Sequence, residues 1–109
     1  MKDHMLDALL TKDYGIAPER IRTFQLPAKT LSFHQLRDIL IRLGQIQYED
    51  TEAKVYIATI DSGFLKKNHA LAALHLSDQI LYISIYAEEG LIPQHTIEGA
   101  INEIQRSIE

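Results

Sequence analysis

The fold of this chain is decided by residues 53–87, which read AKVYIATIDSGFLKKNHALAALHLSDQILYISIYA. Three β-like segments follow one another here, and each has apolar or aromatic residues on both faces. A strand with water on one side alternates apolar and polar residues, so a strand that is apolar on both sides needs a cover on each. We therefore predict that the chain's own helices cover one face of the sheet. The sequence leaves the cover of the other face open.

Hydrophobic spacing predicts three helices and five strands around this stretch. The helical patterns lie at 3–13, 32–43 and 93–108, and the strand patterns lie at 20–26, 45–49, 54–60, 69–76 and 80–87. The clearest end signals belong to the second helix, where Ser32 and Gln35 form a capping box and Gly44 ends the apolar stripe. Gly15 supplies a left-handed stop for the first helix, and the segment at 20–26 is predicted to be an edge strand. We expect a single α+β domain over residues 1–109, with a mainly antiparallel sheet of about five strands packed by helices. The predicted element order is α-β-α-β-β-β-β-α.

Length and composition exclude several classes of protein. A chain of 109 residues suits one domain, and 46% hydrophobic with 24% charged residues is typical of a globular protein. The net charge of −4 argues against binding to a phosphate backbone, and the absence of cysteine excludes disulfides and thiolate zinc sites. Neither a secretory signal nor a bilayer-spanning run is evident. We expect a cytoplasmic protein that binds neither nucleic acid nor membranes.

Pairing of the last two strands predicts which side chains share a face. Opposite residues in an antiparallel pair lie on the same face. The first face, toward the helices, should contain Leu74, Leu76, Leu81, Ile83 and Ile85. The second face should contain His69, Leu71, Ala73, His75, Ile80, Tyr82, Ser84 and Tyr86. The preceding strand extends the second face with Lys54, Tyr56, Ala58 and Ile60 or, if inverted, with Val55, Ile57 and Thr59.

The second face is the predicted contact surface. Large exposed apolar patches are uncommon on monomers, so either the N-terminal helix or a partner should cover this one. We favour a partner, most simply a second copy related by a twofold axis. The expected function is that of a non-catalytic binding or regulatory protein without a cofactor, acting as a homodimer or with a protein partner. The interface residues would be Leu71, His75, Ile80, Tyr82 and Tyr86.

The alternative function uses the polar residues at the strand ends. Strand ends and the start of the last helix should meet at one rim of the sheet, where acid, base and anion-binding groups would converge. The predicted ligand-binding residues there are Asp61, His69, Tyr86, Glu88 and His95. Such a rim would belong to a small-molecule-binding protein or a hydrolytic enzyme.

Two sharper interpretations of these residues are less favoured. His69 and His75 lie on one strand about 20 Å apart, at about 3.3 Å per residue, which is too far for one zinc ion, so no metal site is predicted. The tripeptide Asp61-Ser62-Gly63 resembles the signature of retroviral-type aspartic proteases, whose two copies bring two aspartates together. That mostly β family has few helices, so we interpret the tripeptide as a turn at a strand end.

Overall fold

The computed structural model describes residues 4–62, 68–88 and 95–109. Within them the chain forms three α-helices, a short 3-10 helix and five strands. The helices are α1 (His4–Tyr14), α2 (Phe33–Leu43) and α3 (Thr96–Ile108), and the 3-10 helix is Pro18–Arg20. The strands are β1 (Arg22–Pro27), β2 (Gly44–Asp50), β3 (Val55–Ser62), β4 (Asn68–Ser77) and β5 (Ile80–Tyr86). This order confirms the predicted α+β arrangement.

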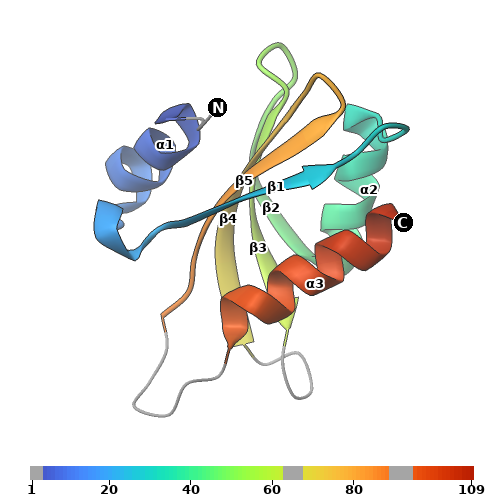
Figure 1. Ribbon diagram of the computed structural model, residues 1–109. Helices are drawn as coiled ribbons and strands as arrows, with labels where there is room; N and C mark the ends of the chain where they lie inside the picture. Colours follow the sequence, from blue (N-terminus) through green and yellow to red (C-terminus); the bar gives the residue numbers. More distant parts are fainter. Residues whose placement is uncertain (1–3, 63–67, 89–94) are drawn as a thin grey trace.

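The five strands form one antiparallel sheet in the order β1-β5-β4-β3-β2. The three doubly apolar strands, β3, β4 and β5, therefore lie in its centre, and β1 is an edge strand as predicted. Helices α2 and α3 pack on one side of the sheet, and α1 lies on the other (Figure 1). The two covers required by the sequence pattern thus both come from this chain.

The first face of the sheet has the predicted residues of β4 and β5. Leu76 is opposite Leu81 and Leu74 is opposite Ile83. Both pairs belong to the main core, and the helices contribute to it with Leu36, Leu40, Ile97, Ala100, Ile101 and Ile104. Burying one large apolar side chain stabilises a fold by about 1.5 to 3 kcal/mol, so this layer supplies most of the driving force.

The favoured orientation of β3 is wrong, and the inverted alternative is observed. Tyr56, Ala58 and Ile60 lie in the main core, while Val55 and Ile57 belong to a second cluster with α1. The register explains the orientation, because Val55 is opposite His75 of the second face. Since β3 is apolar on both sides, its own alternation could not decide between the two orientations.

Helix α2 begins and ends at the predicted residues. The Ser32 hydroxyl accepts from the Gln35 backbone N–H at 3.0 Å, and the Gln35 side chain accepts from the Ser32 N–H at 2.8 Å. Gly44 caps the helix with an extended φ of −177°, not a left-handed one, and the chain passes directly into β2. Glycine is required there by β3 instead, since a Cβ would lie 1.8 Å from the carbonyl oxygen of Thr59.

Two predicted turns are also corrected. Strand β3 continues through Asp61 and Ser62, which pair with β4, so the turn interpretation is wrong for both residues; Gly63 lies outside the described residues. In the β4–β5 hairpin, Ser77 pairs with Ile80, so the turn consists of residues 78–79, which both have positive φ, and not of residues 77–78. Two successive left-handed residues match the twist of a hairpin. The predicted helix start at position 93 lies outside the described residues.

Tyr56 anchors α2 to the sheet from inside the main core. Its side chain is fully buried, its hydroxyl donates to the Phe33 carbonyl at 3.0 Å, and its ring stacks on that of Phe33 with the centroids 4.2 Å apart. Burial raises the pKa of the Tyr56 phenol to about 12. Ionisation of this group is therefore linked to unfolding at high pH.

The substitution Tyr56→Phe should cost about 1 kcal/mol of unfolding free energy at pH 7, because one buried hydrogen bond is lost. The raised pKa means that Tyr56 contributes stability below pH 10 and loses it as the pH rises from 10.0 to about 12. The wild-type advantage should fall by about 1.4 kcal/mol per pH unit in that window. Urea unfolding of both proteins from pH 8 to about 11.5 measures the difference in unfolding free energy. Titration of the other tyrosines and of the lysines contributes equally to both proteins, so it cancels in this difference. An advantage that stays constant with pH would contradict the account.

Candidate functional site

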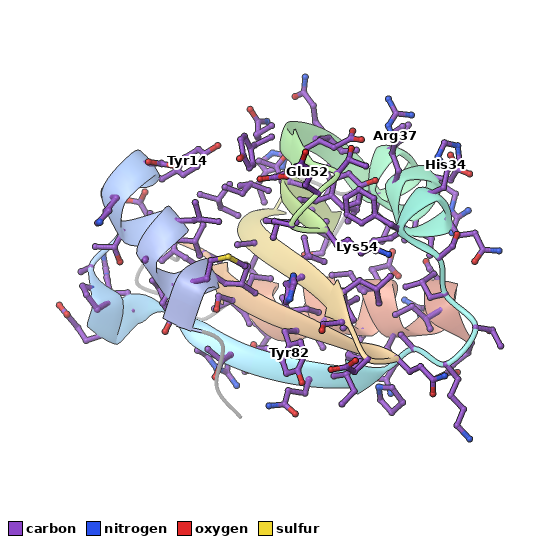
Figure 2. The ribbon with its side chains drawn as sticks, turned by 90° about the horizontal axis from the view of Figure 1, so that it is seen from above. Tyr14, His34, Arg37, Glu52, Lys54 and Tyr82 are labelled. Atoms are coloured by element: carbon purple, nitrogen blue, oxygen red, sulfur yellow. The ribbon has the colours of Figure 1, made fainter. Side chains whose placement is uncertain are left out.

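Helix α1 covers the centre of the second face. Leu6 and Leu10 are fully buried, where they pack against Val55, Ile57 and Ala73. The Ser84 hydroxyl of β5 also donates to a carboxylate oxygen of Asp7 on α1 at 2.5 Å. Figure 2 shows α1, with Tyr14 at its end, apart from α2 and α3. Of the two covers expected for this face, the N-terminal helix is therefore the one observed over its centre, because the leucine stripe of α1 packs there.

The covering helix stops early, and this leaves one end of the second face open. Gly15 has φ +70°, the left-handed conformation that ends a helix, and its N–H donates to the Thr11 carbonyl at 3.1 Å. The Ile16 N–H turns back to the Leu10 carbonyl at 3.2 Å. The chain leaves α1 at this turn, and Thr59, Leu71 and Tyr86 of the sheet remain partly exposed.

A hollow of about 240 Å³ lies at this end of the sheet, and we call it the rim pocket. Its floor is a row of directly paired residues from three adjacent strands, Thr59 of β3, Leu71 of β4 and Tyr86 of β5. Tyr14 and Ile16 form the wall next to α1. The other lining residues are His69, Ala70, Ala87 and Glu88.

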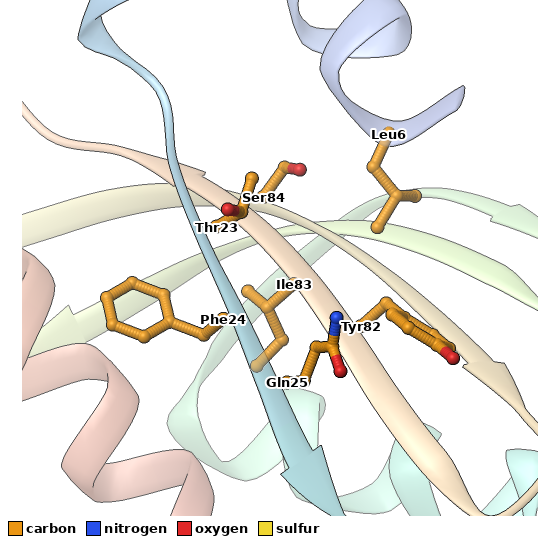
Figure 3. Close-up of a pocket in the computed structure, with 7 residues that line it drawn as sticks. All are labelled: Leu6, Thr23, Phe24, Gln25, Tyr82, Ile83 and Ser84. Atoms are coloured by element: carbon orange, nitrogen blue, oxygen red, sulfur yellow. The ribbon is translucent and has the colours of Figure 1, made fainter. Parts of the chain in front are cut away.

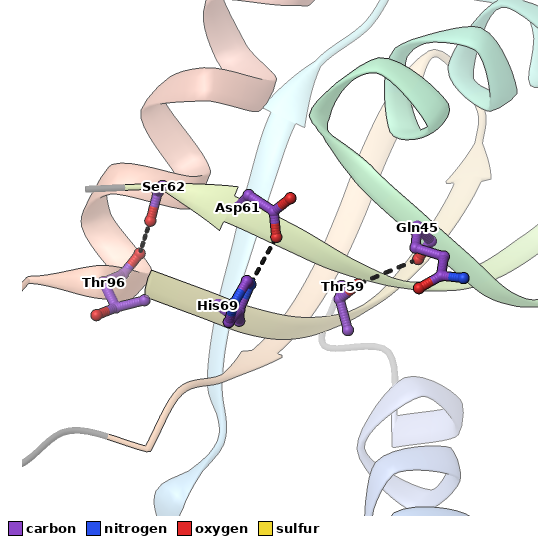
Figure 4. A network of polar contacts seen from close by, with 6 residues as sticks. All are labelled: Gln45, Thr59, Asp61, Ser62, His69 and Thr96. Atoms are coloured by element: carbon purple, nitrogen blue, oxygen red, sulfur yellow. Dashed lines mark hydrogen bonds and ion pairs between the residues drawn. The ribbon is translucent and has the colours of Figure 1, made fainter. Parts of the chain in front are cut away.

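The polar groups of the rim pocket are arranged around His69. Its Nδ1 lies 2.6 Å from Oδ1 of Asp61, which faces it across the β3–β4 pair (Figure 4). A neutral histidine that donates from Nδ1 to a carboxylate has Nε2 as an acceptor. The Thr59 hydroxyl donates to the Gln45 carbonyl at 3.4 Å. His69 is therefore oriented by Asp61, whereas the hydroxyl of the floor is directed to the neighbouring strand β2.

The aromatic ring of Tyr86 has a cation beside it. The guanidinium carbon of Arg20 lies 5.8 Å from the ring centroid, within the range of a cation–π contact. Arg20 is not one of the residues lining the rim pocket. This contact links the 3-10 helix to β5.

The structure brings four of the five predicted ligand-binding residues to this rim. His69, Tyr86 and Glu88 line the pocket, and Asp61 holds His69. His95 does not line it. That residue precedes α3 in a left-handed conformation, with its Nδ1 4.0 Å from a carboxylate oxygen of Glu98.

Sequence reasoning missed the wall and part of the floor. Tyr14 and Ile16 flank Gly15, so the end of the helix at Gly15 was the one sequence signal next to them. Their position beside the second face depends on how α1 packs on the sheet. Thr59 was placed on this face only in the alternative orientation of β3. Of the predicted interface residues, Leu71 and Tyr86 line the rim pocket.

The other predicted interface residues lie along the same face, outside the pocket. His75, Ile80 and Tyr82 are each partly exposed, and the rings of His75 and Tyr82 lie 6.2 Å apart. Self-association through these residues stays a prediction.

Other hollows have different linings. One of about 170 Å³ lies between α1 and the β1–β5 pair, where Leu6 faces Thr23 and Ser84 (Figure 3). Another of about 280 Å³ lies between α2 and α3, and one of about 390 Å³ lies beside the turn at residues 78–79. The rim pocket differs from these in combining two tyrosines, a histidine and a carboxylate.

Neither a metal site nor a membrane-spanning helix is found in the part of the chain that the structure describes. In residues 4–62, 68–88 and 95–109, no group of three or more His, Asp or Glu side chains is placed to hold a metal ion. None of the helices in this part of the chain is long and apolar enough to cross a membrane.

Comparisons with known proteins add no assignment. No protein-family model matches the chain, and no curated protein or solved structure matches it significantly. The function must therefore be inferred from the geometry of the rim pocket and its surroundings.

Proposed function

We propose that this chain is a non-catalytic binding protein that takes a small, flat and largely apolar molecule into the rim pocket. The observation that carries the proposal is the row of Thr59, Leu71 and Tyr86, which lies beyond the end of α1 with Tyr14 beside it. Ligand sites are usually concave and apolar, with a few placed polar groups. His69 and Glu88 are such groups at this pocket.

The size of the rim pocket limits the ligand. Pockets for drug-sized molecules measure about 300 to 1,000 Å³, and the rim pocket, at about 240 Å³, is smaller. A molecule with one ring or two fused rings fits this volume. Tyr14 and Tyr86, which both line the pocket, favour an aromatic ring over an aliphatic chain, because offset or edge-to-face aromatic pairs add attraction to area burial.

The arrangement around His69 favours binding over hydrolysis. A histidine oriented by a carboxylate, as Asp61 orients His69, can act as a general base for a nucleophile within hydrogen-bond reach. The hydroxyl of Thr59 donates to the Gln45 carbonyl instead. Among the described lining residues no serine or cysteine takes the nucleophile's place. Direct hydrolysis would need a water molecule and a substrate carbonyl both held within reach of His69, whereas binding needs only the apolar floor and the polar groups already at the pocket.

A single-ring probe, 2-phenylethanol, should bind the rim pocket with a Kd of about 1 mM, which corresponds to about 4 kcal/mol spread over nine heavy atoms. In a ¹⁵N–¹H NMR titration the amide signals of Thr59, Leu71 and Tyr86 should shift. The variant Leu71→Arg should abolish these shifts, because it places a long charged side chain in the floor. Ile41→Arg is the matched control, since Ile41 is 51% exposed on α2 and the same charge is added away from the pocket.

The result that would overturn the proposal is also specific. Shifts confined to the groove between α2 and α3 would place the binding site elsewhere. The absence of any shift at about ten times the expected Kd would mean that the pocket does not bind such molecules. The folded NMR spectrum of each variant shows whether the substitution has left the domain intact.

A further inference from the structure

Among the described residues, the charged groups around the rim pocket include more carboxylates than basic groups. Glu88 lines the pocket, and Asp61 lies behind His69. None of the described lining residues is lysine or arginine, and Arg20 stands on the ring of Tyr86 without lining the pocket. Among the described residues, two carboxylates and one guanidinium therefore lie at this rim.

We propose that the ligand of the rim pocket is an organic cation, an aromatic ring that carries an ammonium group on a short chain. The inference rests on the proposed function and names the class of molecule that the same pocket takes. The ring would lie on Leu71 between Tyr14 and Tyr86, and the ammonium would be directed to Glu88 at the mouth.

Two features of the pocket suit such a cation. The carboxylate of Glu88 is exposed at the mouth and attracts a positive charge. The faces of tyrosine rings carry negative potential, which attracts an ammonium within about 6 Å.

An anionic ligand would be disfavoured by the same groups. A carboxylate in the pocket would face Glu88, and its only cationic partner among the described lining residues would be protonated His69. The Nδ1 of His69 already pairs with Asp61. A neutral ligand would bind through the apolar floor alone, without the contribution of Glu88.

Three probes of nearly equal size separate these cases: 2-phenylethylamine, which is a cation at pH 7, 2-phenylethanol and 3-phenylpropanoate. Titrated by NMR at low salt, the amine should bind about fivefold more tightly than the alcohol, and the anion should bind most weakly. Glu88→Gln should remove the preference for the amine, measured as the ratio of the dissociation constants of the alcohol and the amine for the same variant. Glu52→Gln is the matched control, because it removes the same charge from the β2–β3 turn at the other end of β3.

The outcomes distinguish this inference from the proposed function. If the alcohol binds and the amine binds no better, the cation inference is overturned and the proposed function stands. If Glu52→Gln reduces the preference as much as Glu88→Gln, the preference reflects net charge, and the inference is again overturned. If none of the probes shifts Thr59, Leu71 or Tyr86, the proposed function itself fails.

Discussion

Replacing Gly44 with alanine should destabilise the protein by about 4 kcal/mol or more, among the largest losses that single substitutions produce. The new Cβ would lie 1.8 Å from the carbonyl oxygen of Thr59 and 2.8 Å from its carbonyl carbon. Both are backbone atoms of β3, and Gly44 itself pairs with Ile60. Relief therefore requires β2 to move away from β3, which breaks the ladder at its start. Since small domains have total stabilities of about 5 to 15 kcal/mol, a large part of the stability would be lost.

The control for this substitution is Gly15→Ala. A Cβ at Gly15 would meet nothing within 4 Å, so the only cost is the left-handed φ of +70°, which is about 1 kcal/mol for a residue with a side chain. Urea unfolding followed by circular dichroism gives both free energies. Equal costs for the two variants would mean that β2 does not approach Thr59 as described.

Leu10→Ala should cost about 3 kcal/mol and loosen α1 from the sheet. Leu10 is fully buried against the second face, so its truncation removes apolar contacts and leaves a cavity. Lys12→Ala, on the exposed side of the same helix, should change stability by no more than about 0.5 kcal/mol. Unfolding free energies and amide hydrogen exchange of residues 4–14 measure the effect, which should appear as faster exchange in α1.

The same variant tests the relation between α1 and the rim pocket. Tyr14 and Ile16 lie shortly after Leu10 in the chain, and they form the pocket wall only while α1 stays packed on the sheet. Leu10→Ala should therefore weaken the binding of 2-phenylethanol, although Leu10 does not line the pocket. If α1 exchanged no faster in this variant than in Lys12→Ala, its leucine stripe would not be what holds it on the sheet.

Local signals predicted the elements of this fold well. The capping box at Ser32 and the helix stop at Gly15 act over a few residues, so the sequence alone reveals them. The alternation of β4 and β5 also placed Leu74 and Leu76 correctly, because a hairpin turn relates the two strands directly. These are features whose physical cause is close by in the chain.

Long-range features could not be predicted in the same way. The requirement for glycine at position 44 arises from Thr59, which is distant in sequence, and the orientation of β3 depends on its register with β4. Whether α1 or a partner covers the second face depends on where α1 packs. The leucine stripe of α1 does not by itself determine that position. For this reason the position of His69 at the rim could be predicted from the strand end, whereas the position of Tyr14 could not.

The most direct test of the account is to locate a bound probe. Intermolecular NOEs should be measured between the ring protons of 2-phenylethylamine and the side chains of ¹³C-labelled protein. The account predicts NOEs to Tyr14, Leu71 and Tyr86 together, since these residues surround the rim pocket. NOEs only to residues of the α2–α3 groove, such as Leu31 and Ile108, would contradict it.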